Sequence, residues 1–350
     1  MASFNTLYID KRAIKHALAK EIRQKVSNKN TLYFDNLKIL LESPLEANSL
    51  ILTTTPSGSV LKKCPGTNTY SCCNYYILDI GENCPFSCGY CILQDYFKHH
   101  NLIIYVDFLD KLNKMKLADF LPHRRIGTGQ FTDSLALDEV TGFSAGLISY
   151  FEKLPSIMIE LKTKSVNINN LLKLKPIANA VISWSLNPEE IITSVELNTP
   201  TLATRINAAK QIAEHGFKVG FHFDPIILYD NCLKDYLGII EALFLAIPKD
   251  SIKWISMGTL RFTTNLKHIL TNKQPLFKDE FVVCEDNKYR YIRHRRVKAY
   301  KTLLERIKHY FPTTYVYLCM ESPDVWQEVF GFRFENNGAF EQHFNESVAF

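Results

Sequence analysis

The stretch Tyr75-Tyr-Ile-Leu-Asp-Ile-Gly-Glu-Asn-Cys-Pro-Phe-Ser-Cys-Gly-Tyr-Cys91 decides the fold, because it joins a β-rich run to a loop that carries three thiols. Cys84, Cys88 and Cys91 follow a C-x3-C-x2-C spacing, with a proline and a glycine bending the backbone between them. Such a loop can bind three corners of a cubane iron–sulfur cluster and leave the fourth iron without a protein ligand. A vacant iron is a reaction site, whereas a cluster closed by four thiolates usually carries electrons only.

Zinc and inert thiols are the other interpretations of this loop, and the sequence leaves both open. A structural zinc site needs four ligands, and Cys64, Cys72 or Cys73 could supply the fourth. Inert thiols are ordinary for isolated cysteines, but three in one short loop favour a metal centre. Disulfides are not expected, because the cysteine count of nine is odd and the first residues lack the profile of a secretory signal. A reducing, cytoplasmic location is therefore expected.

Length and composition set the limits for the architecture. With 350 residues and 46% hydrophobic content, the chain can bury a large core, as one barrel-sized domain with an extension or as two domains. No apolar run approaches the length of a membrane span, so no membrane partner is expected. The net charge of +5 permits a nucleic-acid partner without arguing for one.

Short β-rich runs alternate with longer amphipathic stretches through the middle of the chain. The predicted strands are Tyr75–Ile80, Arg125–Gly127, Ile157–Leu161, Ala180–Ser185, Lys218–Phe223 and Ile252–Ser256. Apolar residues at three- and four-residue intervals predict helices over Phe108–Leu117, Asp138–Leu154, Thr201–His215 and Leu233–Leu245. This alternation predicts an α/β fold with a parallel sheet, and six units fit a partial (β/α)6 TIM-type barrel. Because chemistry in such barrels lies on the loops after the strands, the cysteine loop stands where a site belongs.

The chain divides by this pattern into three parts. Residues 1–73 form an N-terminal cap with a predicted helix over Lys11–Val26, and residues 74–262 form the partial barrel. Residues 263–350 form a C-terminal extension with a helix over Tyr300–Tyr310 and a strand over Tyr315–Leu318. This extension also carries the most basic segment of the chain.

The cysteine spacing is similar to that of the radical S-adenosylmethionine (SAM) enzymes, in which the open iron of a [4Fe–4S] cluster binds SAM and reduces it. Polar loops after three successive strands are the candidate SAM contacts: Gly127, Gly129 and Gln130 after the second, Lys164 after the third, and Ser185 and Asn187 after the fourth. Glycines bring backbone close to a ligand, a cation pairs with a carboxylate, and a hydroxyl or amide suits ribose. Taken singly, an ordinary turn, a surface lysine and a helix N-cap explain the same residues.

The segment Lys288-Tyr-Arg-Tyr-Ile-Arg-His-Arg-Arg-Val-Lys298 places six cationic residues and a histidine in eleven positions. Tyrosines alternate with arginines at its start, which suits stacking on bases and binding of phosphates. A solvated helix face accounts for the same charges. Both interpretations stay open from composition alone.

An ordered set of motifs resembles the spore photoproduct lyase family of radical SAM enzymes, from Tyr8–Arg12 to the basic segment. The motifs are Cys84-Pro-Phe-Ser-Cys-Gly-Tyr-Cys-Ile-Leu-Gln94, Ile126-Gly-Thr-Gly-Gln-Phe-Thr-Asp133, Lys162–Lys164, Ser185–Asn187, Gly220–Ile226, Arg261–Thr263 and Lys288–Tyr291. The resemblance implies that a 5′-deoxyadenosyl radical abstracts hydrogen from a thymine-dimer lesion in DNA, so that two thymines are restored. It also implies that Lys164 and Ser185 contact SAM, that DNA meets the side chains of Arg261, Arg290, Tyr291 and Arg293, and that a reductant such as flavodoxin or ferredoxin supplies electrons.

Two positions depart from the family pattern. Gln130 stands where the family carries a cysteine that returns a hydrogen atom, and Ile92 replaces one of two tyrosines around the third cluster cysteine, while Tyr90 is kept. Tyr90 and Gln130 are therefore the candidate catalytic residues, and Cys64, Cys72 or Cys73 could replace the missing thiol by proximity in sequence. The altered relay leaves open a radical SAM enzyme that acts on RNA or a small molecule. A zinc-stabilised nucleic-acid-binding protein is a third hypothesis.

Overall fold

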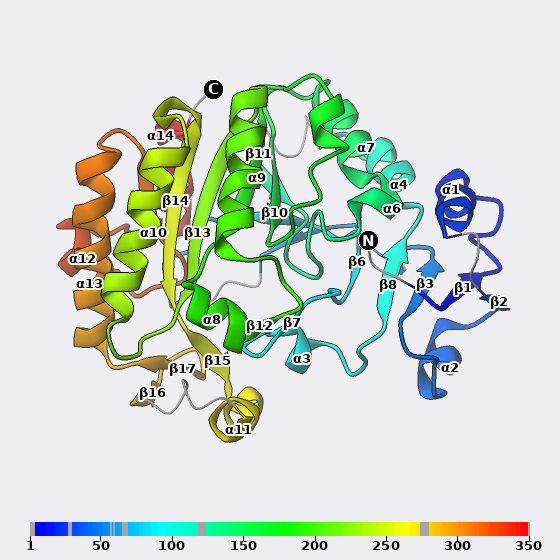
Figure 1. Cartoon of the computed structure of the whole chain (residues 1–350), viewed down its shortest axis with the longest axis horizontal. Helices are drawn as coiled ribbons and strands as arrows, with labels where there is room; N and C mark the ends of the chain where they lie inside the picture. Colours follow the sequence, from blue (N-terminus) through cyan, green and yellow to red (C-terminus); the bar gives the residue numbers. More distant parts are fainter. Residues whose placement is uncertain are drawn as a thin grey trace.

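The computed structural model describes residues 4–26, 30–56, 58, 60–64, 69–117, 124–273 and 280–348. An eight-stranded sheet of order β18-β14-β13-β11-β10-β9-β5-β4 curls around the centre (Figure 1). Its strands are β4 (Leu61–Lys63), β5 (Tyr76–Leu78), β9 (Arg125–Gly127), β10 (Met158–Thr163), β11 (Ala180–Ser185), β13 (Lys218–Ile226), β14 (Ile252–Thr259) and β18 (Tyr315–Leu318). All neighbours from β18 to β5 pair in parallel, and β4 pairs antiparallel with β5. The predicted partial barrel is confirmed.

Helices cover the outer face of this sheet, as the βαβ pattern predicts. The main ones are α4 (Phe108–Lys114), α7 (Phe143–Phe151), α9 (Leu202–His215), α10 (Cys232–Ala246) and α12 (Arg293–Tyr310) (Figure 1). Helix α9 begins after Thr201, whose hydroxyl caps the Thr204 amide, and ends at Gly216 with φ 111°. The predicted helix over Asp138–Leu154 is divided into α6 (Asp138–Thr141) and α7, because Gly142 adopts a left-handed φ of 66° between them.

The N-terminal part contains a second sheet that the sequence analysis did not predict. Its order is β2-β1-β3-β8-β6, with bounds β1 (Thr6–Asp10), β2 (Asn30–Phe34), β3 (Ser49–Thr53), β6 (Gly81–Glu82) and β8 (Leu102–Tyr105). It lies beside the curled sheet, with α1 (Ala17–Lys25) and α2 (Leu37–Glu42) at the right of Figure 1. The predicted helix from Lys11 begins later, at Ala17, because residues 11–15 form turns.

The C-terminal part adds a three-stranded antiparallel sheet and further helices. Strands β15 (Arg261–Thr263), β17 (Lys288–Tyr291) and β16 (Phe281–Val283) pair in that order, near α11 (Thr264–Lys273). Helix α12 begins at Arg293, earlier than predicted, so the basic segment is split between a strand and a helix. Helices α13 (Pro323–Phe330) and α14 (Asn337–Ser347) complete the chain. Strand pairing crosses both predicted boundaries, because β8 pairs with β3 and β18 pairs with β14.

One interior feature closes the open side of the curled sheet. Ser71 forms an antiparallel bridge with Glu321, so the segment before β5 lies against the segment after β18. Trp254 is fully buried in β14, and its ring lies against the Arg125 guanidinium inside the barrel. Among the helices of the described ranges, none combines the length and the apolar character that crossing a membrane requires.

Candidate active site

The cysteine loop is held in place by backbone pairing and by one glutamine. Strand β7 (Ser87–Cys88) pairs antiparallel with β12 (Glu196–Leu197), which sets Cys88 opposite Glu196. Helix α3 (Leu93–Tyr96) follows the loop, and its Gln94 side-chain amide donates to the carbonyls of Cys88 and Gly89, both at 3.0 Å. These contacts fix the loop that follows β5, and such loops carry the functional residues in barrels of this type.

An open pocket of about 590 Å³, a volume that includes the solvent-filled space at its mouth, brings the predicted site residues together. All three loop cysteines line it, and so do Tyr90, Gly129, Gln130, Lys164 and Ser185, with Thr132, Asp133, Lys162 and Thr163 beside them. A Cβ added at Gly129 would lie 2.7 Å from the Lys162 carbonyl oxygen, so only glycine fits this wall. We call this space the cluster cavity.

The donor set of the cluster cavity fits an iron–sulfur cluster. Burial raises the pKa of Cys84 and raises that of Cys88 to about 12, and metal binding would deprotonate such thiols outright. Burial alone would lower the pKa of Lys164, but the charges of Cys88 and Glu196 raise it, so this cation stays beside the thiols. No three His, Cys, Asp or Glu side chains in the described ranges converge on a point that would hold one metal ion. A cubane cluster does not require its ligands to converge on one point, because each cysteine binds a different iron.

Asp133 positions the predicted SAM loops relative to one another. Its carboxylate accepts hydrogen bonds from the Thr163 hydroxyl at 2.6 Å and from the Lys164 amide at 2.7 Å. It also accepts from the amides of Leu135 and Ala136 in its own loop. The loop after β9 is thereby joined to the end of β10, which aims Lys164 at the cavity.

A buried ion pair lies behind the cluster cavity and was not found from the sequence. Glu196 and Arg205 are both fully buried and lie 2.6 Å apart. Glu196 also accepts hydrogen bonds from the Tyr90 hydroxyl and from the Asn187 amide, while the Tyr236 hydroxyl donates to the Asn187 carbonyl oxygen. The prediction that Asn187 contacts SAM is corrected, because both of its polar groups are used inside the protein. Asn187 instead helps to orient Tyr90.

Gly127 has a role in packing. It is buried at the end of β9, and an added Cβ would lie 2.0 Å from the Tyr75 hydroxyl oxygen. The glycine is therefore required for packing against Tyr75. Gly127 does not line the cluster cavity, and its contact with the cofactor stays a prediction.

A second pocket, of about 570 Å³ with the solvent-filled space at its mouth included, adjoins the first and shares Gly129, Gln130 and Lys162 with it. We call it the inner cavity. Its remaining walls are Cys64, Cys72, Cys73, Tyr75, Arg125, Glu160, His222, Asp224, Tyr317, Leu318, Cys319, Met320 and Phe340. A ligand in the inner cavity would lie next to one in the cluster cavity, at the C-terminal ends of the barrel strands.

The floor of the inner cavity is a polar layer built from one residue on each of five neighbouring strands. His222 contacts the Glu160 carboxylate at 2.7 Å and the Ser256 hydroxyl at 2.6 Å, and the Ser183 hydroxyl donates to Glu160 at 2.7 Å. Arg125 lies 3.8 Å from the same carboxylate. Burial would raise the pKa of Glu160, but the charges of Arg125 and His222 lower it to about 2. The layer is therefore charged and internally paired.

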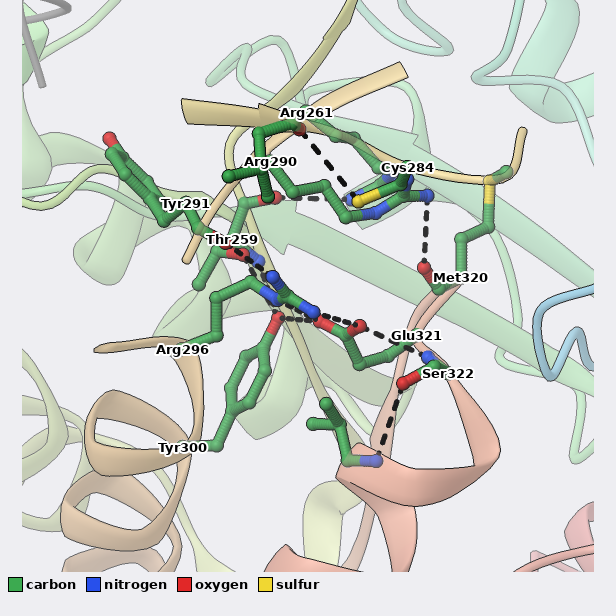
Figure 2. A network of polar contacts seen from close by, with 12 residues as sticks. Thr259, Arg261, Cys284, Arg290, Tyr291, Arg296, Tyr300, Met320, Glu321 and Ser322 are labelled. Atoms are coloured by element: carbon green, nitrogen blue, oxygen red, sulfur yellow. Dashed lines mark hydrogen bonds and ion pairs between the residues drawn. The ribbon is translucent and has the colours of Figure 1, made fainter. Parts of the chain in front are cut away.

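The structure corrects the prediction that Arg290 and Tyr291 contact DNA directly. Arg290 is 1% exposed, and its two terminal nitrogens donate to the Asp286 carboxylate at 2.6 and 2.8 Å. Tyr291 is fully buried, and its hydroxyl accepts from the Leu228 amide at 3.0 Å. Figure 2 shows the Arg290 guanidinium between Cys284 and Met320. Intramolecular hydrogen bonds use the polar groups of both residues, so both residues stabilise the β15–β17–β16 sheet.

The other two predicted DNA contacts remain at or near the surface. Arg261 forms a two-pronged ion pair at 2.8 and 3.1 Å with Asp224, which lines the inner cavity. Arg293 begins α12 with half of its side chain exposed, and it pairs with Asp324 and Glu328. Contact of these two arginines with DNA stays a prediction.

Replacing Arg296 by alanine is expected to lower the free energy of unfolding by about 3–5 kcal/mol, as for other broken buried ion pairs. Its guanidinium lies 2.9 Å from the Glu321 carboxylate, and both residues are buried (Figure 2). The variant leaves Glu321 buried without its cation. Arg293→Ala is the matched control, since its exposed pairs should contribute at most about 1 kcal/mol. Urea unfolding measures both, and equal losses would contradict the assignment.

Comparisons with known proteins agree with this geometry. The family model described as "Spore photoproduct lyase" matches residues 3–318. The spore photoproduct lyase of Bacillus subtilis (strain 168) is 24% identical over 81% of this chain and 85% of its own length, and that of Clostridium acetobutylicum is 27% identical over 55% and 58%. A solved spore photoproduct lyase complexed with dinucleoside spore photoproduct has a TM-score of 0.74 at 17% identity, covering 91% of this chain and 98% of its own. The chain belongs to the spore photoproduct lyase family.

Proposed function

We propose that this chain is a radical SAM lyase that reverts a thymine-dimer lesion in DNA. One observation carries the proposal: three thiols and the predicted SAM contacts Gln130, Lys164 and Ser185 line one cavity, and a second cavity adjoins it. Family membership gives the reaction class, and a solved relative is described with bound AdoMet and dinucleoside spore photoproduct.

The residues of the cluster cavity divide the work of holding the cofactors. Cys84, Cys88 and Cys91 would hold the [4Fe–4S] cluster, and Lys164 and Ser185 would hold the SAM carboxylate and ribose. When bound, the cluster supplies the electron that cleaves SAM to a 5′-deoxyadenosyl radical. The chemistry of that radical belongs to the cofactor, so the protein contributes binding, orientation and exclusion of water.

The inner cavity would receive the lesion. It lies deeper in the barrel and shares a wall with the cluster cavity, so a base that enters it would lie beside the residues that would hold SAM. Reaching it requires the lesion to leave the duplex, which costs least for a damaged, poorly stacked step. A low-potential electron donor of the flavodoxin or ferredoxin class would complete the system.

Turnover of dinucleotide spore photoproduct by the reconstituted protein tests the proposed function. Under anaerobic reduction with SAM, chromatography should show 5′-deoxyadenosine and restored thymine dinucleotide together. SAM cleavage without release of thymine would contradict this substrate. Salt-dependent binding of an RNA in preference to lesion DNA would favour an RNA substrate.

Replacing Lys164 by alanine is expected to weaken SAM binding about ten- to a hundredfold, since a hydrogen bond to a charged group contributes about 1.5–3 kcal/mol. Lys164 lines the cluster cavity, whereas Lys173, the control, is exposed on the protein surface. Equilibrium binding of SAM to both reconstituted variants measures the effect. An unchanged dissociation constant for Lys164→Ala would show that another residue holds the carboxylate.

A further inference from the structure

Four of the nine cysteines line the inner cavity, and the cofactor site uses none of them. Cys64, Cys72, Cys73 and Cys319 are all free thiols on its walls. The bridge between Ser71 and Glu321 brings the segments that carry Cys73 and Cys319 together. Their gathering beside the cluster cavity calls for a chemical explanation.

Cys319 differs from the other three thiols by its position. It directly follows β18, at the C-terminal edge of the barrel where chemistry takes place, and its amide donates to the Met257 carbonyl at 2.8 Å. Its sulfur lies 3.6 Å from Arg261, which Asp224 holds in place. Lys162 lines both cavities, and its positive charge acts to lower the pKa of the Cys319 thiol, against the larger effect of burial.

Two of the remaining thiols have different surroundings. Cys73 accepts a hydrogen bond from Arg125 at 2.8 Å, and Arg125 starts β9, at the opposite end of the strand from Gly127. Cys64 precedes β5, where its amide donates to the Tyr75 carbonyl at 2.8 Å. Cys319 instead directly follows β18.

The chemical state of Cys319 suits transfer of a hydrogen atom. Burial raises the pKa of this thiol to about 12, so it carries its hydrogen at neutral pH. An S–H bond is weaker than the C–H bond of a methyl group, so a carbon-centred radical takes hydrogen from a thiol readily. Hydroxyl and amide groups, including that of Gln130, hold their hydrogens too strongly for this reaction.

We propose that Cys319 donates the single hydrogen atom that completes one of the two restored thymines, an inference that rests on the proposed function. The product carbon radical takes the hydrogen from the Cys319 thiol, which breaks the S–H bond, forms a C–H bond and leaves a sulfur-centred radical. That radical returns to the thiol by taking one electron from the low-potential donor protein and one proton from water. Gln130 then has no part in hydrogen return.

Turnover in deuterated water tests the step, because thiol hydrogens exchange with solvent. Wild-type protein should place one solvent deuterium in the methyl group of the product, as mass spectrometry reads. Cys319→Ser, which keeps the size and polarity of the side chain, should lose this label and release less thymine while still producing 5′-deoxyadenosine. Cys232→Ser, outside both cavities, should keep both the label and the yield. Full label in Cys319→Ser, or an equal loss of label in Cys232→Ser, would overturn the proposal.

A second measurement needs no cofactor. Dinucleotide spore photoproduct bound to the protein without cluster or SAM should slow alkylation of Cys319 at alkaline pH, read by peptide mass spectrometry. Cys232 in α10, which lines neither of the two cavities, serves as the unprotected control. Equal alkylation of Cys319 with and without the dinucleotide would contradict its place beside the lesion. Failure of the proposed function is seen separately, as absence of thymine release from the wild-type protein.

Discussion

Replacing Cys88 by alanine is expected to abolish the iron–sulfur cluster and, with it, all cleavage of SAM. Cys88 is the most buried of the three loop thiols, and backbone pairing of β7 with β12 fixes its position. The variant leaves the cluster with two protein thiolates in place of three. Among the described residues, no cysteine outside the loop lines the cluster cavity, so none can replace the lost ligand. Cys84→Ala and Cys91→Ala should have the same effect for the same reason.

Cys232→Ala is the matched control for that experiment. Cys232 is also a buried cysteine, but it begins α10 on the outer face of the barrel. Its variant should keep about four irons and four sulfides per chain, as a cubane requires. Iron and sulfide analysis after anaerobic reconstitution measures each variant. Full iron content in Cys88→Ala would show that this thiol is not a ligand.

Replacing Glu160 by glutamine is expected to lower the free energy of unfolding by about 3–5 kcal/mol at neutral pH, because it breaks a buried ion-pair network. Arg125 would remain buried among the rings of Tyr75, Trp254 and Tyr317 without its carboxylate. Denaturant unfolding at pH 7 measures the loss. This loss of unfolding free energy is among the largest that a single substitution in this protein should cause.

The difference in stability between wild type and Glu160→Gln should depend on pH. The folded protein lowers the pKa of Glu160 from 4.5 to about 2, so the folded state binds a proton less readily than the unfolded chain. The stability that this carboxylate contributes is complete above pH 4.5 and is lost as the pH falls toward 2. Wild type and Glu160→Gln should therefore converge in stability over that window. Glu152→Gln, at an exposed position, should follow the wild type throughout, and a constant difference for Glu160→Gln would contradict the assignment.

The barrel was predictable because its strands are short apolar runs separated by amphipathic helices. The strand Ala180–Ser185 and the strand Tyr315–Leu318 have the predicted bounds, although the second belongs to the curled sheet and not to a separate extension. The N-terminal sheet was missed because a five-residue strand such as Thr6–Asp10 is buried at every position and shows no alternation. Strand β3 of this sheet pairs with β8, about fifty residues later, and a pairing at that distance leaves no local signal.

The cluster cavity was largely predictable, and the inner cavity was not. Cys88 and Lys164 follow strand ends, where barrel geometry places functional side chains. Glu160 and His222 lie inside strands, and their signal was a single polar residue within an apolar run. Arg290 was misjudged because a charge run does not say which of its members face inward; pairing with Asp286 makes its burial possible.

Electron paramagnetic resonance of the reduced, anaerobically purified protein tests the central claim most directly, which is that one iron is left open for SAM. We expect a brown protein with about four irons per chain, whose reduced-cluster signal changes when SAM is added. Lys164→Ala should need more SAM for the same change. A colourless protein that contains zinc, or a cluster signal that SAM leaves unaltered, would contradict the account.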